Sequence, residues 1–393
     1  MRTSTPRPIK DYCIGIYDGP HATPKEASDG PIFLGIKNIT DDGHLDLSQI
    51  RHISEEEFPR WTRRVTPQAD DIVFTYEATL HRYAIIPKGF RGCLGRRVAL
   101  VRPDPNKVDS RYLLYYFMSH EWRKVVEIIN GATVDRIPLE RFPDFPIALP
   151  SLSVQRKITT ILSIYNDLIE NNQRRMALLE ESVRLLYQEW FIRLRFPGHE
   201  HTRIIDGVPE GWENKTLGEL ADVTMGQSPE SKYYNETGEG LPFHQGVADF
   251  GNRFVTDRVY TTAQNRVAYE GSILCSVRAP VGRLNITLNK IVIGRGLSAL
   301  RSLSGHQSFL FYQMRAHFFK EDMIGSGAIF ASVTKTEFEN QKLLSPPNQL
   351  VQAFEEISVP IDNQLRMLFF QNQKLRSARD LLLPRLMSGE ITV

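Results

Sequence analysis

The sequence predicts an α+β chain in which two similar β-rich globular domains are separated by two long helices, paired as an antiparallel coiled coil with pseudo-twofold symmetry. Three observations predict it: an internal duplication, turn-punctuated β segments within each copy, and a heptad pattern of apolar residues after each copy. The predicted boundaries are a domain at 1–149, a helix at 150–196, a domain at 197–346 that opens with a linker at 197–212, and a helix at 347–393.

The duplication rests on five pairs of similar segments that follow in the same order in both halves of the chain. The pairs are 30–33 with 240–243, 72–75 with 273–276, 95–102 with 294–301, 112–115 with 309–312, and 131–142 with 327–338. The offset of about 200 residues makes each copy the size of a domain rather than of a solenoid repeat. Five ordered matches make chance similarity an inadequate explanation.

Each copy has the same coarse pattern of elements. Short β-rich runs come first, separated by Gly, Pro, Asn and Asp; a helix follows, and prolines mark the end. The expected strands are 32–36, 72–75, 98–101, 273–277 and 290–293, and the expected helices are 110–128 and 305–323.

After each copy, apolar residues recur at alternating steps of three and four, the pattern of a coiled-coil seam. The first seam consists of Leu162, Tyr165, Ile169, Asn172, Met176, Leu179, Val183, Leu186 and Trp190, and the second of Ile361, Leu365, Leu368, Asn372, Leu375, Arg379, Leu382 and Leu386. The first helix has roughly 38 residues, so it is over ~50 Å long.

Each seam contains one asparagine, and the two could meet. In an antiparallel pair the a positions of one helix face the d positions of the other, so Asn172 at d and Asn372 at a could share a layer and hydrogen-bond. The alternative is that both lie at the solvent edge. Pro360 predicts a kink or break near the start of the second helix, and Pro384 predicts its end.

The composition bounds the class of protein. The 393 residues are 41% hydrophobic and 24% charged, as in globular proteins, and the formal net charge is only +2, so any basic surface must be local. The cysteines Cys13, Cys93 and Cys275 form no CxxC pair, which predicts neither a disulfide framework nor a zinc site. No stretch approaches the ~20 apolar residues of a membrane span, and the N-terminus lacks a signal peptide. These features predict a soluble cytoplasmic protein.

Motifs of the enzymes that act on DNA are missing. There is no GxxxxGK[ST] loop, and residues 345–348 (Ser-Pro-Pro-Asn) lack the leading Asp or Asn and the aromatic of the adenine methyltransferase motif. Residues 230–232 have the ExK spacing of a nuclease but lie in a polar loop. His199 and His201 belong to a solvated linker without a third metal ligand. The sequence therefore predicts no catalytic residue and no metal site.

Basic side chains gather with aromatic and amide side chains in the β-rich parts of both copies. Arg, Asn and Gln can read base edges, whereas Lys more often contacts phosphate. The candidate DNA-binding residues are Lys25, Lys37, Asn38, Arg63, Arg64, Tyr76, His81, Arg82, Arg96 and Arg97 in the first copy, and Gln227, Lys232, Tyr233, Tyr234, Gln245, Arg253, Arg258, Arg278, Arg283 and Arg295 in the second. Any one arginine could instead be solvated or paired in a salt bridge; the set is more informative than its members.

With these motifs the chain resembles, over nearly its whole length, the specificity (S) subunits of type I restriction-modification systems. The segments that carry the resemblance are 18–24, 33–39, 131–137, 149–150 and Gln155 in the first half, and 208–213, 217–221, 241–247 and 383–391 in the second. The first copy has Asp-Arg-Ile-Pro at 135–138 where the second has Ala-Ser-Val-Thr at 331–334, which leaves local contacts there open.

The resemblance implies two target recognition domains that each read one half of a split site on double-stranded DNA. It implies that the helices act as a ruler between the readers and as the docking surface for two methyltransferase (M) subunits, with two restriction (R) subunits joining for cleavage. S-adenosylmethionine would then bind the M subunit, and ATP and Mg²⁺ the R subunit, so this chain would be a non-catalytic part of a phage-defence complex that methylates adenine at N6. Two alternatives remain: a coiled-coil scaffold that binds only protein, and a stand-alone nuclease or methyltransferase.

Overall fold

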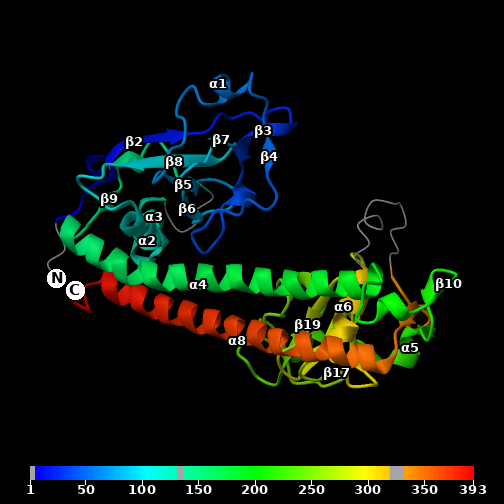
Figure 1. Ribbon diagram of the computed structural model, residues 1–393. Helices are drawn as coiled ribbons and strands as arrows, with labels where there is room; N and C mark the ends of the chain where they lie inside the picture. Colours follow the sequence, from blue (N-terminus) through cyan, green and yellow to red (C-terminus); the bar gives the residue numbers. More distant parts are fainter. Residues whose placement is uncertain (1–4, 131–135, 319–331) are drawn as a thin grey trace. The chain divides into compact units, whose positions relative to one another are not determined.

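The computed structural model describes residues 5–130, 136–318 and 332–393, and the chain divides into two compact units (Figure 1). Unit 1 consists of Met1–Asn172 and Phe370–Val393, and unit 2 of Gln173–Phe369. Each unit therefore combines one β-rich domain with part of both long helices.

The β-rich domain of unit 1 is built from two small sheets. A four-stranded antiparallel sheet has the order β2 (Cys13–Asp18), β8 (Val98–Pro103), β5 (Ile72–Thr75), β6 (Tyr83–Ile85). A three-stranded sheet has the order β4 (Arg51–His52), β3 (Ala27–Leu34), β7 (Gly92–Leu94), and β3 and β7 run parallel. The remaining elements are β1 (Arg7–Pro8), which pairs with β9 (Pro146–Ile147), and the helices α1 (Phe58–Trp61), α2 (Ser110–Met118) and α3 (His120–Asn130).

Every residue of β5 is buried, because different partners cover its two faces. Ile72 and Phe74 pack with residues of α2 and α3, and Val73 packs with residues of β3 and β7. The core beside it is aromatic: Phe74 stacks on Phe142 with ring centroids 4.8 Å apart, and Trp122 Nε1 donates to the hydroxyl of Tyr83 at 2.7 Å. The helix expected at 110–128 is two helices, because the hydroxyl of Ser119 accepts from the amide of Trp122 and so caps a new start.

Unit 2 repeats this plan. Its four-stranded antiparallel sheet has the order β13 (Ala221–Met225), β21 (Leu297–Ser302), β18 (Ile273–Ser276), β19 (Leu284–Ile286). The second sheet has the order β14 (Tyr234–Asn235), β16 (Tyr260–Thr261), β15 (Leu241–His244), β20 (Ile291–Ile293), β17 (Val267–Ala268), and β15 and β20 run parallel, as β3 and β7 do. The remaining elements are β10 (Ile204–Ile205), β11 (Val208–Pro209), β12 (Glu213–Thr216), α5 (Leu217–Leu220), α6 (Gln307–Phe318), α7 (Lys335–Glu339) and β22 (Lys342–Ser345).

The matching strand orders confirm the duplication predicted from the sequence. In the four-stranded sheet of each copy, the strand that comes first in the sequence lies beside the strand that comes last: β2 beside β8, and β13 beside β21. Each copy also has one parallel strand pair in a second sheet. The repeated segments at 131–135 and 327–331, and the end of the helix expected at 305–323, lie outside the described residues.

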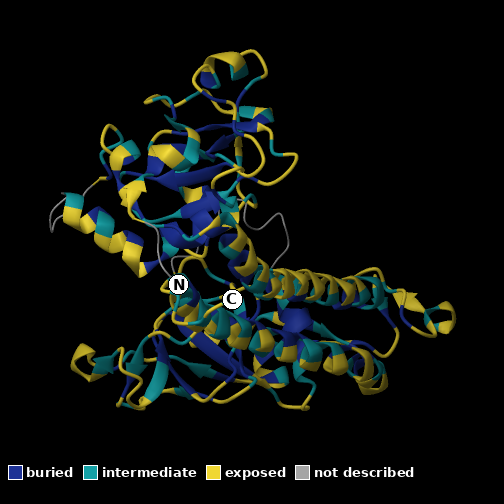
Figure 2. Ribbon diagram, turned by 90° about the vertical axis from the view of Figure 1, so that its left-hand side faces the viewer, coloured by how far each residue is buried: buried dark blue, intermediate teal, exposed yellow. Residues whose placement is uncertain are grey.

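The two long helices are α4 (Leu152–Tyr187), which continues into a π-helical turn at Gln188–Ile192, and α8 (Asn348–Met387). They pair antiparallel in each unit. In unit 1, Asn166 contacts Arg379; in unit 2, the ring centroids of Tyr187 and Phe354 lie 5.8 Å apart. None of the predicted seam residues is exposed, whereas Figure 2 shows exposed residues along the outer faces of both helices. The predicted coiled coil is confirmed.

The asparagine pair forms as proposed. Asn172 Nδ2 donates to Asn372 Oδ1 at 3.0 Å, and the two residues are only 7% and 5% exposed. The solvent-edge alternative is therefore wrong. Both asparagines belong to unit 1, at the end of its share of α4 and the start of its share of α8. A buried polar pair at this layer favours one register of the helices over others.

Two expectations for α8 were wrong: the helix is not broken at Pro360, and it does not end at Pro384. The helix continues through Pro360 and ends at Met387, one turn beyond Pro384. Pro360 is exposed, so the carbonyl group that loses its partner can be solvated, and buried Phe354 and Leu365 on either side hold the helix to its neighbours. Pro384 keeps its own carbonyl in use, since Ser388 N donates to it at 2.9 Å.

Over the described ranges, no helix is long and apolar enough to cross a membrane, and no three His, Cys, Asp or Glu side chains are grouped to hold a metal ion. Burial raises the pKa of the Cys13 and Cys93 thiols to about 12 and raises the pKa of Cys275 as well, so all three stay protonated at neutral pH.

Candidate nucleic-acid interface

Each unit presents one arginine on an equivalent tight turn. Arg96 lies between β7 and β8, and Arg295 between β20 and β21. The preceding glycine fixes the turn: the amide of Gly95 donates to the last residue of β3, and the amide of Gly294 to the last residue of β15, both at 2.8 Å. Both arginines are exposed, and neither side chain has an ion-pair partner within the described ranges.

A second glycine crosses over each turn. Gly19, just after β2, donates to β8 at 2.9 Å, and Gly226, just after β13, donates to β21 at 2.9 Å. A Cβ on Gly19 would collide with the carbonyl oxygen of Gly95, and a Cβ on Gly226 with that of Gly294. Only glycine permits two backbones to approach so closely. The two arginines therefore stand on rigid supports with the same construction in both units.

In unit 2, a hollow of about 560 Å³ opens beside Arg295. Its wall includes Tyr234, whose ring stacks on Phe243 with centroids 4.7 Å apart. The hydroxyl of Ser228 donates to Gln245 Oε1 at 2.7 Å and accepts from the backbone amide of Arg295 at 3.2 Å. The serine thereby fixes the orientation of the Gln245 amide next to the arginine.

Unit 1 has a hollow of about 370 Å³ between the loop after Gly19 and the region of α1. It is lined by Arg60, Arg63, Arg64 and His21, among others. Arg64 forms an ion pair with Asp18, while Arg63 is exposed without an acidic partner in the described part of the chain. The hollow is therefore a basic surface.

The predicted DNA-binding residues fall into three groups, with two half-buried residues, His81 and Tyr234, outside them. The first is exposed with no acidic partner among the described residues: Lys25, Lys37, Arg63, Arg96, Gln227, Tyr233, Gln245, Arg278, Arg283 and Arg295. The second is held by a carboxylate: Arg64 by Asp18, Arg82 by Asp41, Arg97 by Glu77, Lys232 by Glu230 and Arg258 by Asp249. His81 and Tyr234 are half-buried, and burial lowers the pKa of His81, so it is neutral at pH 7.

The third group is buried, and for it the prediction was wrong. Asn38 is 6% exposed because its amide donates to Asp46 O and Gln49 O and accepts from Gly35 N, closing its own loop. Tyr76 is 5% exposed in the aromatic core of unit 1. Arg253 is 2% exposed and paired with acids. None of the three can reach a base edge.

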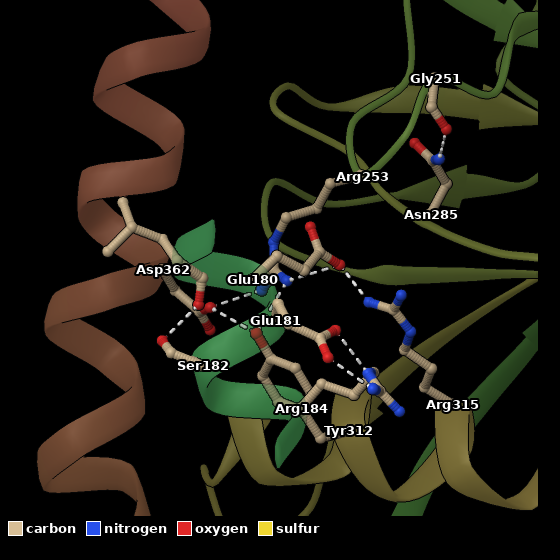
Figure 3. Close-up of polar contacts among 11 residues, drawn as sticks. Glu180, Glu181, Ser182, Arg184, Gly251, Arg253, Asn285, Tyr312, Arg315 and Asp362 are labelled. Carbon is tan, nitrogen blue, oxygen red and sulfur yellow. Dashed lines mark hydrogen bonds and ion pairs between the residues drawn. The ribbon is translucent and has the colours of Figure 1, made fainter. Parts of the chain in front are cut away.

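Arg253 instead joins the domain of unit 2 to its helices (Figure 3). Its guanidinium donates to Asp362 Oδ1 of α8 at 2.5 Å and to the hydroxyl of Tyr312 at 3.0 Å, and lies 3.5 Å from Glu180 Oε1 of α4. Arg315 of α6 also pairs with Glu180. Burial raises the pKa of Asp362, and the charge of Arg253 opposes that rise. The network orients the domain of unit 2 on both helices.

The corresponding place in unit 1 is built from other residues. Tyr115, which aligns with Tyr312, accepts from Asn166 Nδ2 at 2.8 Å, and Asn166 Oδ1 accepts from Arg379 at 3.0 Å. The arginine here belongs to α8, and the loop of the domain supplies Gly43 beside a small hollow of about 60 Å³. The two domains are thus attached to the helices by different chemistry.

Ser228, His21 and Arg60 line the hollows but are not among the predicted DNA-binding residues. The signal was present: Gly226 and Gly19 follow the first sheet strand of each copy, and the next two residues face the arginine turn or its neighbourhood. This shared glycine is a weak signal, because residues 18–22 and 225–229 have only Gly19 and Gly226 in common.

The chain thus contains two copies of one domain type, each presenting a rigid basic turn, and comparisons with known proteins identify that type. Residues 34–181 and 209–354 each match the family described as the type I restriction modification DNA specificity domain. These matches cover well over half of the chain, which therefore belongs to the specificity subunits of type I restriction-modification systems, the subunits that recognise the DNA sequence.

Similar proteins agree with this assignment. The chain is 29% identical to the MjaX specificity subunit of a type I restriction enzyme from Methanocaldococcus jannaschii, with 98% of this chain and 93% of the relative covered. It is 26% identical to the MjaIX specificity subunit from the same organism, with 98% and 89% covered. The crystal structure of a type I S subunit from M. genitalium shares the fold, with a TM-score of 0.56, 17% identity, and 98% and 96% covered.

Proposed function

We propose that this specificity subunit reads a bipartite sequence on double-stranded DNA, with the domain at 1–149 reading one half and the domain at 197–346 the other. The segments 150–196 and 347–393 would set the gap between the halves. The observation that carries the proposal is the duplicated turn: Arg96 and Arg295 are equivalent, exposed and without an acidic partner in the described residues, on supports held by the same backbone bonds. An arginine that is not paired with a carboxylate keeps its charge and its N–H donors available for base edges and phosphates.

The helices would also dock two M subunits. In unit 2, Leu178, Leu185 and Ile192 are exposed and recur at one heptad position, away from the seam with α8. A row of exposed apolar side chains on one helix favours a protein partner. Two R subunits would join the same assembly for restriction. S-adenosylmethionine would then bind the M subunits, and ATP and Mg²⁺ the R subunits. This chain would contribute recognition without catalysis, in the cytoplasm.

Selection from a random pool of duplexes by the chain assembled with its M subunit tests the proposal. The expected result is enrichment of two specified segments with an unspecified gap of fixed length. Capture of the M subunit without any DNA enrichment would show a scaffold instead. Methylation or cleavage of DNA by the purified chain alone would show a stand-alone enzyme. Either result overturns the proposal.

A further inference from the structure

We propose that Arg295 and Arg96 each read a guanine in the major groove, one in each half of the site, and that Gln245 assists Arg295 as a second donor. This inference rests on the proposed function and names the residues and the base through which it acts.

Two arginines line the hollow of unit 2, and only one of them lacks an acidic partner among the described residues. Arg258 lines it, but its Nε donates to Asp249 Oδ1 at 3.1 Å, and its Nη2 lies 3.0 Å from the same oxygen in an ion pair. An arginine so neutralised would have to break that pair to reach DNA. Arg295 has no such partner in the described part of the chain. It is the arginine of this hollow that is available without rearrangement.

The hydrogen-bond donors beside Arg295 indicate which base it would read. A glutamine reads adenine bidentately only if both its oxygen and its nitrogen face the base. Gln245 Oε1 already accepts from the hydroxyl of Ser228 at 2.7 Å, which leaves Nε2 as the outward group. The guanidinium of Arg295 has donors only. An all-donor surface matches the N7 and O6 acceptors of guanine, whereas adenine would oppose it with the N6 amino group.

The turn that carries Arg295 is held by several backbone contacts. Bidentate contacts demand a fixed approach, and a turn that could shift would lose the discrimination. The amide of Arg295 donates to Ser228 Oγ, the amide of Gly294 donates to β15, and the backbone of Gly226 lies against Gly294. These three contacts hold the backbone at Arg295 in place.

Arg96 of unit 1 occupies the equivalent turn. The amide of Gly95 donates to β3, and the backbone of Gly19 lies against Gly95. No side chain of unit 1 repeats the bond between Ser228 and Gln245 among the described residues, because His21 and Gly35 stand at those places. Arg96 is thus expected to read its guanine alone, and Arg295 with help.

The test uses the chain assembled with its M subunit, and duplexes that carry its recognised sequence. Each guanine is replaced in turn by 7-deazaguanine, which lacks the N7 acceptor. For the unmodified chain, one such replacement in each half should weaken binding roughly 10- to 100-fold, the range for a good bidentate pair. The Arg295→Ala variant should have lost the response at one guanine, and Arg96→Ala the response at one guanine of the other half.

Arg203→Ala is the matched control, because Arg203 is an exposed arginine of unit 2 that lies just before β10, remote in sequence from the turn. It should leave every response unchanged. Arg295→Lys, which keeps the charge but not the fork, should lose most of the discrimination while binding DNA more tightly than Arg295→Ala. If Arg295→Ala fails to fold, the lysine variant alone decides the question.

Three results would overturn the inference: a half-site without guanine, a guanine response that survives in Arg295→Ala, or equal weakening at all positions with a salt slope lower by about one, which marks a phosphate contact. Failure of the proposed function looks different, since the unmodified assembly would then show no sequence preference at all.

Discussion

Arg253 gives the sharpest energetic prediction. Replacement by methionine keeps most of the side-chain volume but removes the charge that Asp362 and Glu180 face. Arg253 is 2% exposed, so water cannot take its place. Breaking a buried pair by removing one partner costs about 3–5 kcal/mol, because an uncompensated buried charge remains. Glu180 keeps Arg315, so the loss concentrates on Asp362.

Urea unfolding of the purified chain measures the effect. We expect Arg253→Met to lower the unfolding free energy of unit 2 by about 3–5 kcal/mol. The matched control is Arg258→Met, whose arginine pairs with Asp249 but has a side chain 66% exposed; it should change stability by about 0–1 kcal/mol. Equal effects of the two substitutions would refute the argument that burial gives the Arg253 network its weight.

The pH dependence follows from the sign of the shift. Burial raises the pKa of Asp362 in the folded state, so the folded protein binds this proton more tightly than the unfolded chain does. The stability that Asp362 contributes is therefore present at low pH, and it is lost as pH rises through the folded-state pKa. Without Arg253 that pKa rises further. The cost of Arg253→Met should therefore be smaller at pH 5 than at pH 8, and a cost that grows on acidification would contradict the assignment of Asp362 as the unpaired charge.

Three further predictions concern the helices and the glycine crossing. Asn172→Leu alone should destabilise unit 1 by about 1–3 kcal/mol, because it leaves the Oδ1 atom of Asn372 buried without its donor. Replacing both asparagines by leucine should stabilise the chain but loosen its register. Thermal unfolding measures the first effect, and cysteine cross-linking across the seam measures the second. Deleting one heptad from both α4 and α8 should shorten the unspecified gap in the recognised sequence, and an unchanged gap would refute the ruler. Gly226→Ala should cost about 1–3 kcal/mol and weaken recognition in one half-site only, as read by binding to duplexes altered in either half; an effect on both halves would contradict local action.

The architecture could be predicted from the sequence because its signals are periodic or repeated. Heptads identify the seam down to the meeting of Asn172 and Asn372, since an antiparallel pair has few registers that bury every apolar position. The duplicated turn was visible as the aligned Gly-Arg pairs at 95–96 and 294–295. Both features depend on spacing, which a single sequence displays.

Individual surface roles could not be predicted because they depend on what each side chain meets in space. Arg253 and Arg295 look alike in the sequence, yet Arg295 is exposed. Arg253 is buried, with Asp362 of α8 and Glu180 of α4 as its acidic partners. Pro360 misled for the same reason: its local penalty was visible, while the buried neighbours that outweigh it were not.

Two matched domains should each read their own stretch of duplex. Methylation mapping at single-base resolution, on DNA from cells that express this chain with its M subunit, tests it most directly. The predicted result is a motif of two specified segments, with a constant number of unspecified base pairs between them, and Arg96→Ala and Arg295→Ala should each relax a different segment. One continuous motif, or both variants relaxing the same segment, would contradict the claim.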